Sequence, residues 1–291
     1  MKPRKTGPYP YSPIIRRPKV RWPNGARVAL WVIPNIEYFA LDEPITTQKV
    51  PDVPGFSVRD YGNRIGVFRI METLDRHGIR GTVALNSDLI VHHPEIIEEG
   101  NARGWEWMGH NESNTRYLND MKEEEAAAAV RRTVEAITKG TGKAPKGWLS
   151  SGLHETWGTL DQLADNGIEY CANWIVDDQP VAMKLDDGRT IHAMPYSTEV
   201  NDKPAFERRF MTPGDFDQLI RRQFDTLWRE GEHQARVMAI ALHPYLIGMP
   251  HRIGALDSAL AHICAHEGVW RATGSEIIAA WKGLAGSKST T

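Results

Sequence analysis

The chain has 291 residues, 41% of them hydrophobic and 25% charged, a composition typical of a soluble globular protein with a sizeable core. Its formal net charge is −2, so no overall excess of charge points to nucleic acid or to an acidic membrane. The two cysteines, Cys171 and Cys264, are too few for a disulfide framework and lie in no CxxC pair. We therefore expect neither a nucleic-acid partner nor a membrane partner.

The beginning of the chain is basic and rich in proline. Residues 1–36 carry eight Lys and Arg and no Asp or Glu. Six prolines up to Pro23, and the lack of a long apolar run, argue against a helix and against a secretory signal. No segment approaches the roughly 18 to 20 apolar residues of a membrane span. We expect a cytoplasmic protein whose residues 1–26 form an arm, either packed on the domain or a partner subunit, or disordered.

From Arg27 onward, short β-branched and aromatic runs alternate with helical patterns. In chain order, strands are expected at 28–33, 81–85, 104–108, 146–149, 169–175, 190–194, 237–242 and 269–272. Helices are expected between them at 64–77, 94–103, 122–139, 155–165, 215–229, 255–266 and 275–281. Such alternation is typical of parallel strands joined by helices.

This pattern predicts an α/β fold, a single-domain, distorted TIM-like (β/α) barrel with seven to eight parallel strands over residues 27–285. A flexible tail at 286–291 would follow it. A doubly wound open sheet is the rival architecture. It would favour a Gly-rich phosphate turn after the first strand, and Pro34-Asn-Ile-Glu37 bears no likeness to GxGxxG.

Polar and aromatic side chains follow the expected strands, at the edge where parallel barrels place their chemistry. They are Glu37 after the first strand, His110 and Asn114 after the third, Trp148 at the end of the fourth, Trp174, Asp177 and Asp178 at and after the fifth, and His243 after the strand from Val237. An acid, two histidines, amides and tryptophans from separate strand ends are the components of a hydrolytic pocket.

Each candidate also has a purely structural interpretation. Glu37 could pair with an arginine instead of acting on a substrate. His110 could be bonded to the backbone, and Asp177-Asp178 could form a solvated turn before Pro180. His243 follows an apolar strand and precedes a proline that restricts its backbone, which favours function. Three further histidines, His77, His92 and His93, are expected to lie outside the site.

At these residues the chain resembles the polysaccharide deacetylase superfamily, and within it the branch of metal-independent allantoinases and cyclic imide hydrolases. The resemblance covers roughly Arg21 to Trp281. It rests on motifs in chain order at strand ends: Arg21–Arg27, Asn35-Ile-Glu37, Asp60–Arg64, Gly147-Trp-Leu149 with Glu155-Thr156, Trp174 with Asp177–Pro180, and Leu242–Arg252. The proline-rich arm resembles the subunit-contacting arm of this branch, which implies a homo-dimer or homo-tetramer.

The superfamily's deacetylases use an Asp-Asp pair, a base followed by a metal ligand, and complete the metal site with His-x-x-x-His. In this chain the resemblance places Glu37 at the base position, Tyr38 at the ligand aspartate and Asn114 at the second histidine, so that only His110 is retained. One histidine with a phenol and an amide is a poor zinc cage. No metal is favoured, although a divalent metal such as zinc could still be held by Glu37, His110 and Asn114.

We expect a hydrolase of small cyclic or linear amides, such as ureides or imides, that needs no metal. Glu37, made more basic by the apolar strand beneath it, would activate water, and His243 would protonate the leaving nitrogen. His110 and Asn114 would hold the carbonyl oxygen or orient the water. Trp148 and Trp174 would wall a flat ring, and Asp177 or Asp178 would accept hydrogen bonds from the substrate. The alternatives are a metal-dependent deacetylase of N-acetylated amino sugars and a non-catalytic barrel that binds a small molecule.

Overall fold

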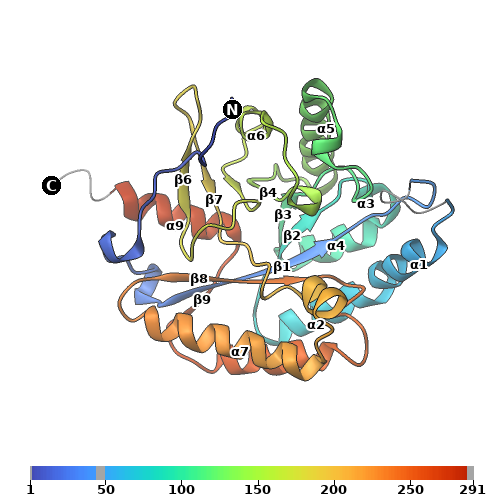
Figure 1. Cartoon of the computed structure of the whole chain (residues 1–291). Helices are drawn as coiled ribbons and strands as arrows, with labels where there is room; N and C mark the ends of the chain where they lie inside the picture. The colour runs from blue at the N-terminus through green and yellow to red at the C-terminus, as the bar shows by residue number, and fades with distance from the viewer. Residues whose placement is uncertain (1, 44–49, 287–291) are drawn as a thin grey trace.

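A curled, mostly parallel sheet of nine strands organises the protein (Figure 1). The computed structural model describes residues 2–43 and 50–286; the predicted tail, beyond Gly286, lies outside this part of the chain. The strands are β1 Val28–Ile36, β2 Thr82–Leu85, β3 Glu106–Gly109, β4 Gly147–Trp148, β5 Tyr170–Cys171, β6 Val181–Lys184, β7 Thr190–Ala193, β8 Arg236–Leu242 and β9 Val269–Arg271. The predicted distorted (β/α) barrel is confirmed in the form of a half-barrel.

The order of strands is β6-β7-β5-β4-β3-β2-β1-β8, with β9 paired to the first residues of β1. All ladders are parallel except the one between β6 and β7. No ladder joins β8 to the other end of the sheet within the described ranges. Instead, single backbone bonds bring loops to its free edge: Val237 N–H donates to Asp178 O at 2.8 Å and Ala241 N–H to Val200 O at 3.0 Å.

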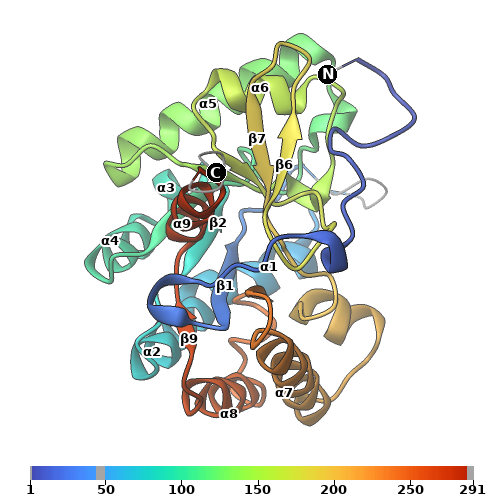
Figure 2. The same cartoon turned by 90° about the vertical axis from the view of Figure 1, so that its left-hand side faces the viewer.

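Helices cover the outside of the curled sheet, as Figures 1 and 2 show together. They are α1 Val53–Tyr61, α2 Val67–Arg76, α3 Leu89–His92, α4 Pro94–Ala102, α5 Glu123–Thr141, α6 Thr159–Asp165, α7 Pro213–Glu230, α8 Ile253–Cys264 and α9 Gly274–Gly286, with π-helical turns at Gly62–Gly66 and Pro204–Arg208. Helices α2, α7 and α8 lie on one side, and α5 and α6 on the opposite side (Figure 2). No helix in the described ranges has both the length and the apolar character needed to cross a bilayer.

The side chains of each strand divide between an interior core and the layer under the helices. Along β1, Ala29, Trp31 and Ile33 belong to the interior cluster, whereas the alternate residues Leu30 and Val32 pack against the outer helices. This alternation follows from the two-residue period of a strand. It decides which residues of a strand end can reach a site inside the barrel.

The N-terminal arm packs on the barrel. Trp22 is almost fully buried in the interior cluster, and its indole N–H donates to the carbonyl of Arg236 at 2.7 Å. Further up the arm, Lys184 N–H of β6 donates to Pro8 O at 2.8 Å. The arm thus covers the end of the barrel where β1 and β8 begin (Figure 2). The expected dimer or tetramer stays a prediction.

Candidate active site

Three side chains at the ends of β1, β3 and β8 meet inside the barrel. The Glu37 carboxylate oxygen Oε1 lies 3.5 Å from His243 Nε2 and 3.8 Å from His110 Nε2. All three side chains are at most 5% exposed. Residues separated by more than 200 positions come together because parallel strands end at one edge of the sheet. The structure thus brings together the three catalytic candidates taken from the sequence.

A fourth buried residue, Asp202, holds His243 in place. Its Oδ1 accepts the Nδ1–H of His243 at 2.6 Å, and its Oδ2 accepts the backbone N–H of His243 at 2.7 Å and of Ile247 at 3.2 Å. Because Nδ1 carries a proton, the Nε2 atom of His243 is the one directed at Glu37. Asp202 thereby sets both the position and the tautomer of the imidazole.

The charges of this cluster determine the protonation states of Glu37 and His243. Burial alone would lower the pKa of His243, but the charges of Asp202 and Glu37 and its hydrogen bonds raise it to about 9. Burial alone would raise the pKa of Glu37, yet the charges of Lys203 and His243 and the contact with the His243 imidazole hold it well below its usual range. At neutral pH Glu37 is therefore ionised and His243 is an imidazolium.

The expectation that apolar surroundings make Glu37 more basic is wrong. The strand beneath it is apolar, as β1 is buried throughout, but the carboxylate itself faces cations. An opposite charge within a few ångströms outweighs the desolvation of a buried acid. The basicity of Glu37 is set by the site and not by the strand.

His110 is bonded to the backbone, as its structural interpretation predicted, and it also lines the cavity, while its functional role stays a prediction. Its Nδ1–H donates to the carbonyl of Leu149 at 2.5 Å, which leaves a lone pair on Nε2 when the ring is neutral. That Nε2, together with Glu37 Oε2 and Asn114 Oδ1, is buried without a hydrogen-bond partner. Unpartnered buried polar atoms are rare in folded proteins. Here they offer acceptors to the two protons of a water or to a substrate N–H.

A cavity of about 410 Å³ opens onto these residues. Its walls include Tyr117, His154 and Tyr196, and its rim is cationic: Lys203, Arg208 and Arg209 all line it. The volume is within the range of pockets for small molecules. The three histidines set aside from the sequence, His77, His92 and His93, do not line the cavity, as expected.

The tryptophans expected to wall the pocket lie elsewhere. Trp148 is fully buried in the cluster beneath α5 and α6, because it takes the outward position of β4 while Leu149 takes the inward one. Trp174 packs against the same outer cluster, lies edge-on to Tyr9 with ring centroids 5.9 Å apart, and donates its indole N–H to Glu155 Oε1 at 3.1 Å. Neither indole lines the cavity.

The two aspartates expected to bind substrate are also outside the cavity. Asp177 forms an ion pair with Arg17 of the N-terminal arm, and its Oδ1 accepts from that guanidinium at 2.8 Å. Asp178 lies 3.7 Å from Arg236 Nε. Both therefore line a separate surface hollow beside the arm. The prediction that they bind substrate in the central cavity rested on their position after β5, but the chain beyond β5 leads away from that cavity.

Sequence reasoning missed the groups that support the base and the acid. Asp202 begins the helical turn that leads into Pro204–Arg208, outside the predicted strands and helices, and no spacing pattern marks it. Asn86, after β2, accepts the Tyr38 backbone N–H at 2.8 Å and donates to the His110 carbonyl, so it ties the ends of β1 and β3. Asn63 donates to the Glu37 carbonyl at 3.0 Å. Asn63 lies within the Asp60–Arg64 motif, which was the one available signal.

Comparisons with known proteins agree with this architecture. Residues 59–171 match the family model described as Polysaccharide deacetylase. A Schizosaccharomyces pombe (strain 972) protein named "Putative polysaccharide deacetylase" is 28% identical over 296 residues, covering 89% of this chain and 92% of that protein. The solved structure of Puue Allantoinase superposes with a TM-score of 0.83 at 25% identity, covering 92% and 94% of the two chains. A "probable Polysaccharide deacetylase" from Pseudomonas aeruginosa PAO1 superposes with a TM-score of 0.81 at 26% identity, covering 92% and 95%.

The resemblance to the polysaccharide deacetylases is thus confirmed: residues 59–171 are similar to that family, and they lie on a curled (β/α) barrel. With its allantoinase-like and deacetylase-like neighbours, it is a hydrolase of the class that acts on carbon–nitrogen bonds other than peptide bonds.

The metal site that the deacetylase resemblance implies does not fit these residues. Tyr38, at the position of the ligand aspartate, turns away from the cavity and stacks on His92 with ring centroids 4.5 Å apart. Asn114 offers only an amide, and Glu37 already faces the His243 imidazolium. Catalytic zinc sites use three protein ligands from His, Cys, Asp and Glu.

Proposed function

We propose that this protein hydrolyses a small cyclic or linear amide, such as a ureide or an imide, by acid–base catalysis between Glu37 and His243. The observation that carries the proposal is a buried carboxylate and a buried imidazolium 3.5 Å apart, each in the protonation state that the reaction needs. A base must begin deprotonated and an acid protonated. The likeness to Puue Allantoinase supports the same choice of substrate class.

The attacking water is held by Glu37 and His110. Glu37 Oε2 and His110 Nε2 both lack a partner and both accept hydrogen bonds, so one water can donate a proton to each. As the oxygen attacks the carbonyl carbon, Glu37 takes one of its protons and a C–O bond forms. In this proposal His110 orients the water, and its unpartnered Nε2 supports that role over binding of the carbonyl oxygen, which needs a hydrogen-bond donor.

His243 completes the reaction at the leaving group. Its Nε2–H is transferred to the nitrogen as the C–N bond breaks, so the amine leaves neutral. Asp202 stabilises the imidazolium before the transfer. The contact between Glu37 and His243 then lets the proton gained by the carboxylate return to the imidazole, which restores both groups for the next turnover.

The cavity favours a small substrate with negative charge. About 410 Å³ holds a single ring or a short chain and its substituents. Arg209 is paired with Glu199 at 2.7 Å, but no hydrogen bond, ion pair or ring contact is formed by Arg208 among the described residues. A carboxylate on the substrate would meet this free guanidinium at the rim.

Replacing the base tests the proposal directly. Glu37→Gln keeps the shape of the side chain and removes its basicity, so turnover of the best substrate should fall by about 10²–10⁴-fold. A panel of allantoin, hydantoin, succinimide, acidic amides and chitin oligosaccharides would identify that substrate. Glu112→Gln is the matched control, because Glu112 pairs with Arg132 on the surface and lies outside the cavity. Full activity of Glu37→Gln would refute the assignment.

The same panel separates the alternatives. A metal-dependent deacetylase would act on the chitin oligosaccharides and lose activity when chelator removes its metal, whereas the proposed reaction should survive chelation. A non-catalytic binding protein would turn over none of the compounds while some of them raised its melting temperature.

A further inference from the structure

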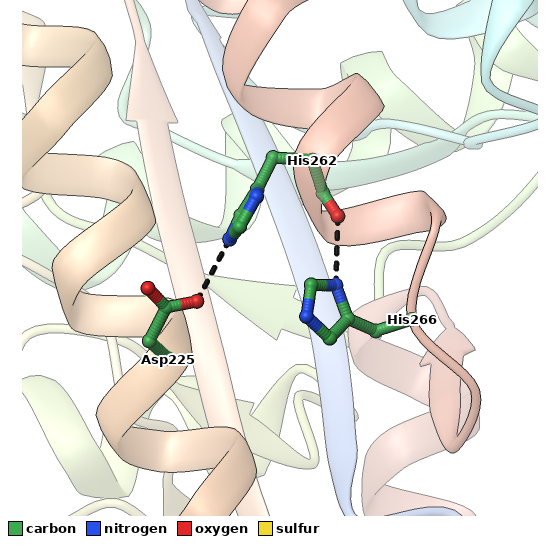
Figure 3. Close-up of side chains that lie close together, drawn as sticks. All are labelled: Asp225, His262 and His266. Atoms are coloured by element: carbon green, nitrogen blue, oxygen red, sulfur yellow. Dashed lines mark hydrogen bonds and ion pairs between the residues drawn. The ribbon is translucent and has the colours of Figure 1, made fainter.

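A cluster of metal-binding side chains lies outside the barrel, between α7 and α8. Its members are Asp225 on α7, His262 on α8 and His266, two residues beyond the end of α8 (Figure 3). One ligand atom from each lies within 4.8 Å of the others. No second group of three His, Cys, Asp or Glu side chains with ligand atoms this close together is found among the residues that the structure describes. None of the three lines the central cavity.

The geometry points to a zinc-binding site formed by Asp225, His262 and His266. Two imidazoles and one carboxylate are a common zinc ligand set, whereas Mg²⁺ and Ca²⁺ prefer oxygen ligands alone. The histidines are four residues apart, as on one face of a helical turn, and the carboxylate comes from the facing helix. Water would supply the fourth ligand. The bound ion would join α7 to α8, because its ligands come from α7 and from the end of α8.

The tautomer of His266 is already the one a metal needs. Its Nδ1–H donates to the backbone carbonyl of His262 at 2.9 Å, so its Nε2 carries the free lone pair. Figure 3 shows this second nitrogen on the side of the ring away from the carbonyl. Metal-binding histidines almost always donate their other ring N–H in this way.

The surrounding side chains hold the imidazoles in place. The ring of His266 lies edge-on to Phe224 and to Trp228, with ring centroids 5.0 and 5.2 Å away. His262 Nε2 is 2.7 Å from Asp225 Oδ1 and its side chain is 25% exposed. Ligand atoms around a tetrahedral zinc, with bonds of about 2.0–2.2 Å, lie roughly 3.3–3.6 Å apart. On binding zinc, His262 Nε2 and Asp225 Oδ1 would move slightly apart, and the His266 ring would move toward both. Side-chain rotation allows these movements, because the site is partly exposed.

The test uses the full-length protein, stripped by chelator and titrated with zinc chloride. We expect one zinc per chain by calorimetry, and a melting temperature several degrees higher with saturating zinc, because a ligand that binds the folded state stabilises it. His266→Gln and Asp225→Asn should lose both effects while folding normally without metal. His233→Gln replaces an exposed histidine in the turn after α7 and should retain both effects.

Two results would overturn the assignment. One is the absence of stoichiometric zinc binding to the stripped wild type. The other is zinc binding that persists in His266→Gln and disappears in His110→Gln, which would place the metal in the central cavity. If the assignment is right, amide hydrolysis is the same with and without zinc. Zinc in the purified protein would then report on the outer helices and not on the catalytic mechanism.

Discussion

His243 has an acid on each ring nitrogen, Asp202 on Nδ1 and Glu37 on Nε2. Two negative charges stabilise the imidazolium more than burial opposes it, which is why its pKa is raised to about 9. Proton donation to a leaving nitrogen requires this form of the ring. The rate should therefore fall on the alkaline side as His243 loses its proton, with an apparent pKa near 9 in the wild type.

In Asp202→Asn, the fall in rate at alkaline pH should occur at lower pH than in the wild type. Removing an opposite charge at hydrogen-bond distance shifts a pKa by about 1–3 units. The measurement is kcat/KM from pH 6 to 10 for the wild type and the variant. Asp217→Asn is the control, because Asp217 pairs with Arg221 on α7 outside the cavity. If kcat/KM were lower but fell at the same alkaline pH as in the wild type, Asp202 would contribute only to folding and not to the pKa of His243.

Arg208 tests the charge of the substrate. Its guanidinium lines the cavity, is exposed, and forms no hydrogen bond or ion pair with the described residues. Arg208→Gln should raise KM about tenfold for amides that carry a carboxylate, with kcat unchanged, because the contact is made equally before and during reaction. Neutral amides should be unaffected. Arg222→Gln on α7 controls for the loss of one positive charge. Equal effects on neutral and anionic substrates would contradict the role.

At the scale of single residues, the sequence predicted Glu37, His110 and His243 because each directly follows an apolar run. It failed at Trp148 because a strand of two residues carries too little alternation to fix its phase. Whether Trp148 or Leu149 faces inward is decided by the register of β4 against β3 and β5, where Gly109 pairs with Trp148 and Trp148 with Cys171. That register is a tertiary property.

The loop that carries His243 is positioned by the π-helical turn Gly62–Gly66, whose glycines allow the two backbones to make contact. The turn Gly62–Gly66 joins α1 to α2 and lies against Pro244 and Tyr245. A Cβ on Gly66 would lie 2.1 Å from the Pro244 carbonyl oxygen, and one on Gly62 would lie 2.6 Å from the Tyr245 nitrogen. Asn63, between these glycines, holds the Glu37 carbonyl. One helical turn therefore supports the base and the acid together.

Gly66→Ala should damage stability and catalysis at once. The new methyl group meets backbone, which cannot rotate away, so a loss of about 1–3 kcal/mol in the free energy of unfolding is expected with a fall in kcat. Gly254→Ala in α8 is the matched control: nothing lies within 4 Å of its Cβ, so it should be neutral or slightly stabilising. Denaturant unfolding and kinetics measure both. If Gly66→Ala kept the wild-type kcat, the turn Gly62–Gly66 would have no role in positioning His243.

Most elements were predicted because their apolar period was long enough to recognise. Helix α5 lies within three residues of its expected bounds, and β8 within one. The sequence did not indicate α1 or β6. Helix α1 contains a proline and a glycine and buries no residue fully. Strand β6 is an antiparallel edge with one buried residue, so neither shows a clear pattern.

The whole barrel is connected through the buried charges at its centre. Glu37, His110 and His243 directly follow β1, β3 and β8, and Asp202 begins the helical turn beside the free edge of β8. The described strands form no ladder that closes the barrel, and at this edge Asp202 and the bridge between Asn201 and Ala241 join the segment after β7 to β8. The ion pairs of the candidate site therefore also hold the two sides of the half-barrel together.

Stability should consequently depend on pH through the same groups. The pKa of His243 is raised from 6.5 to about 9, so its contribution is complete below pH 6.5 and is lost as pH rises through 9. The pKa of Glu37 is lowered from 4.5, so its contribution is complete above pH 4.5 and is lost as pH falls through the depressed value. Both are complete only between about pH 4.5 and 6.5. A shift of this size in His243 corresponds to about 3 kcal/mol.

Melting temperatures of the wild type and Glu37→Gln between pH 5 and 10 test this coupling. Without the Glu37 charge the folded-state pKa of His243 falls, so the alkaline loss of stability, which begins near pH 6.5 in both proteins, should be smaller in the variant and should end at lower pH than in the wild type. The difference between the two curves isolates the ion pair, because surface lysines and tyrosines titrate alike in both proteins. Parallel curves over the whole range would mean that the Glu37–His243 contact does not contribute to the folded barrel.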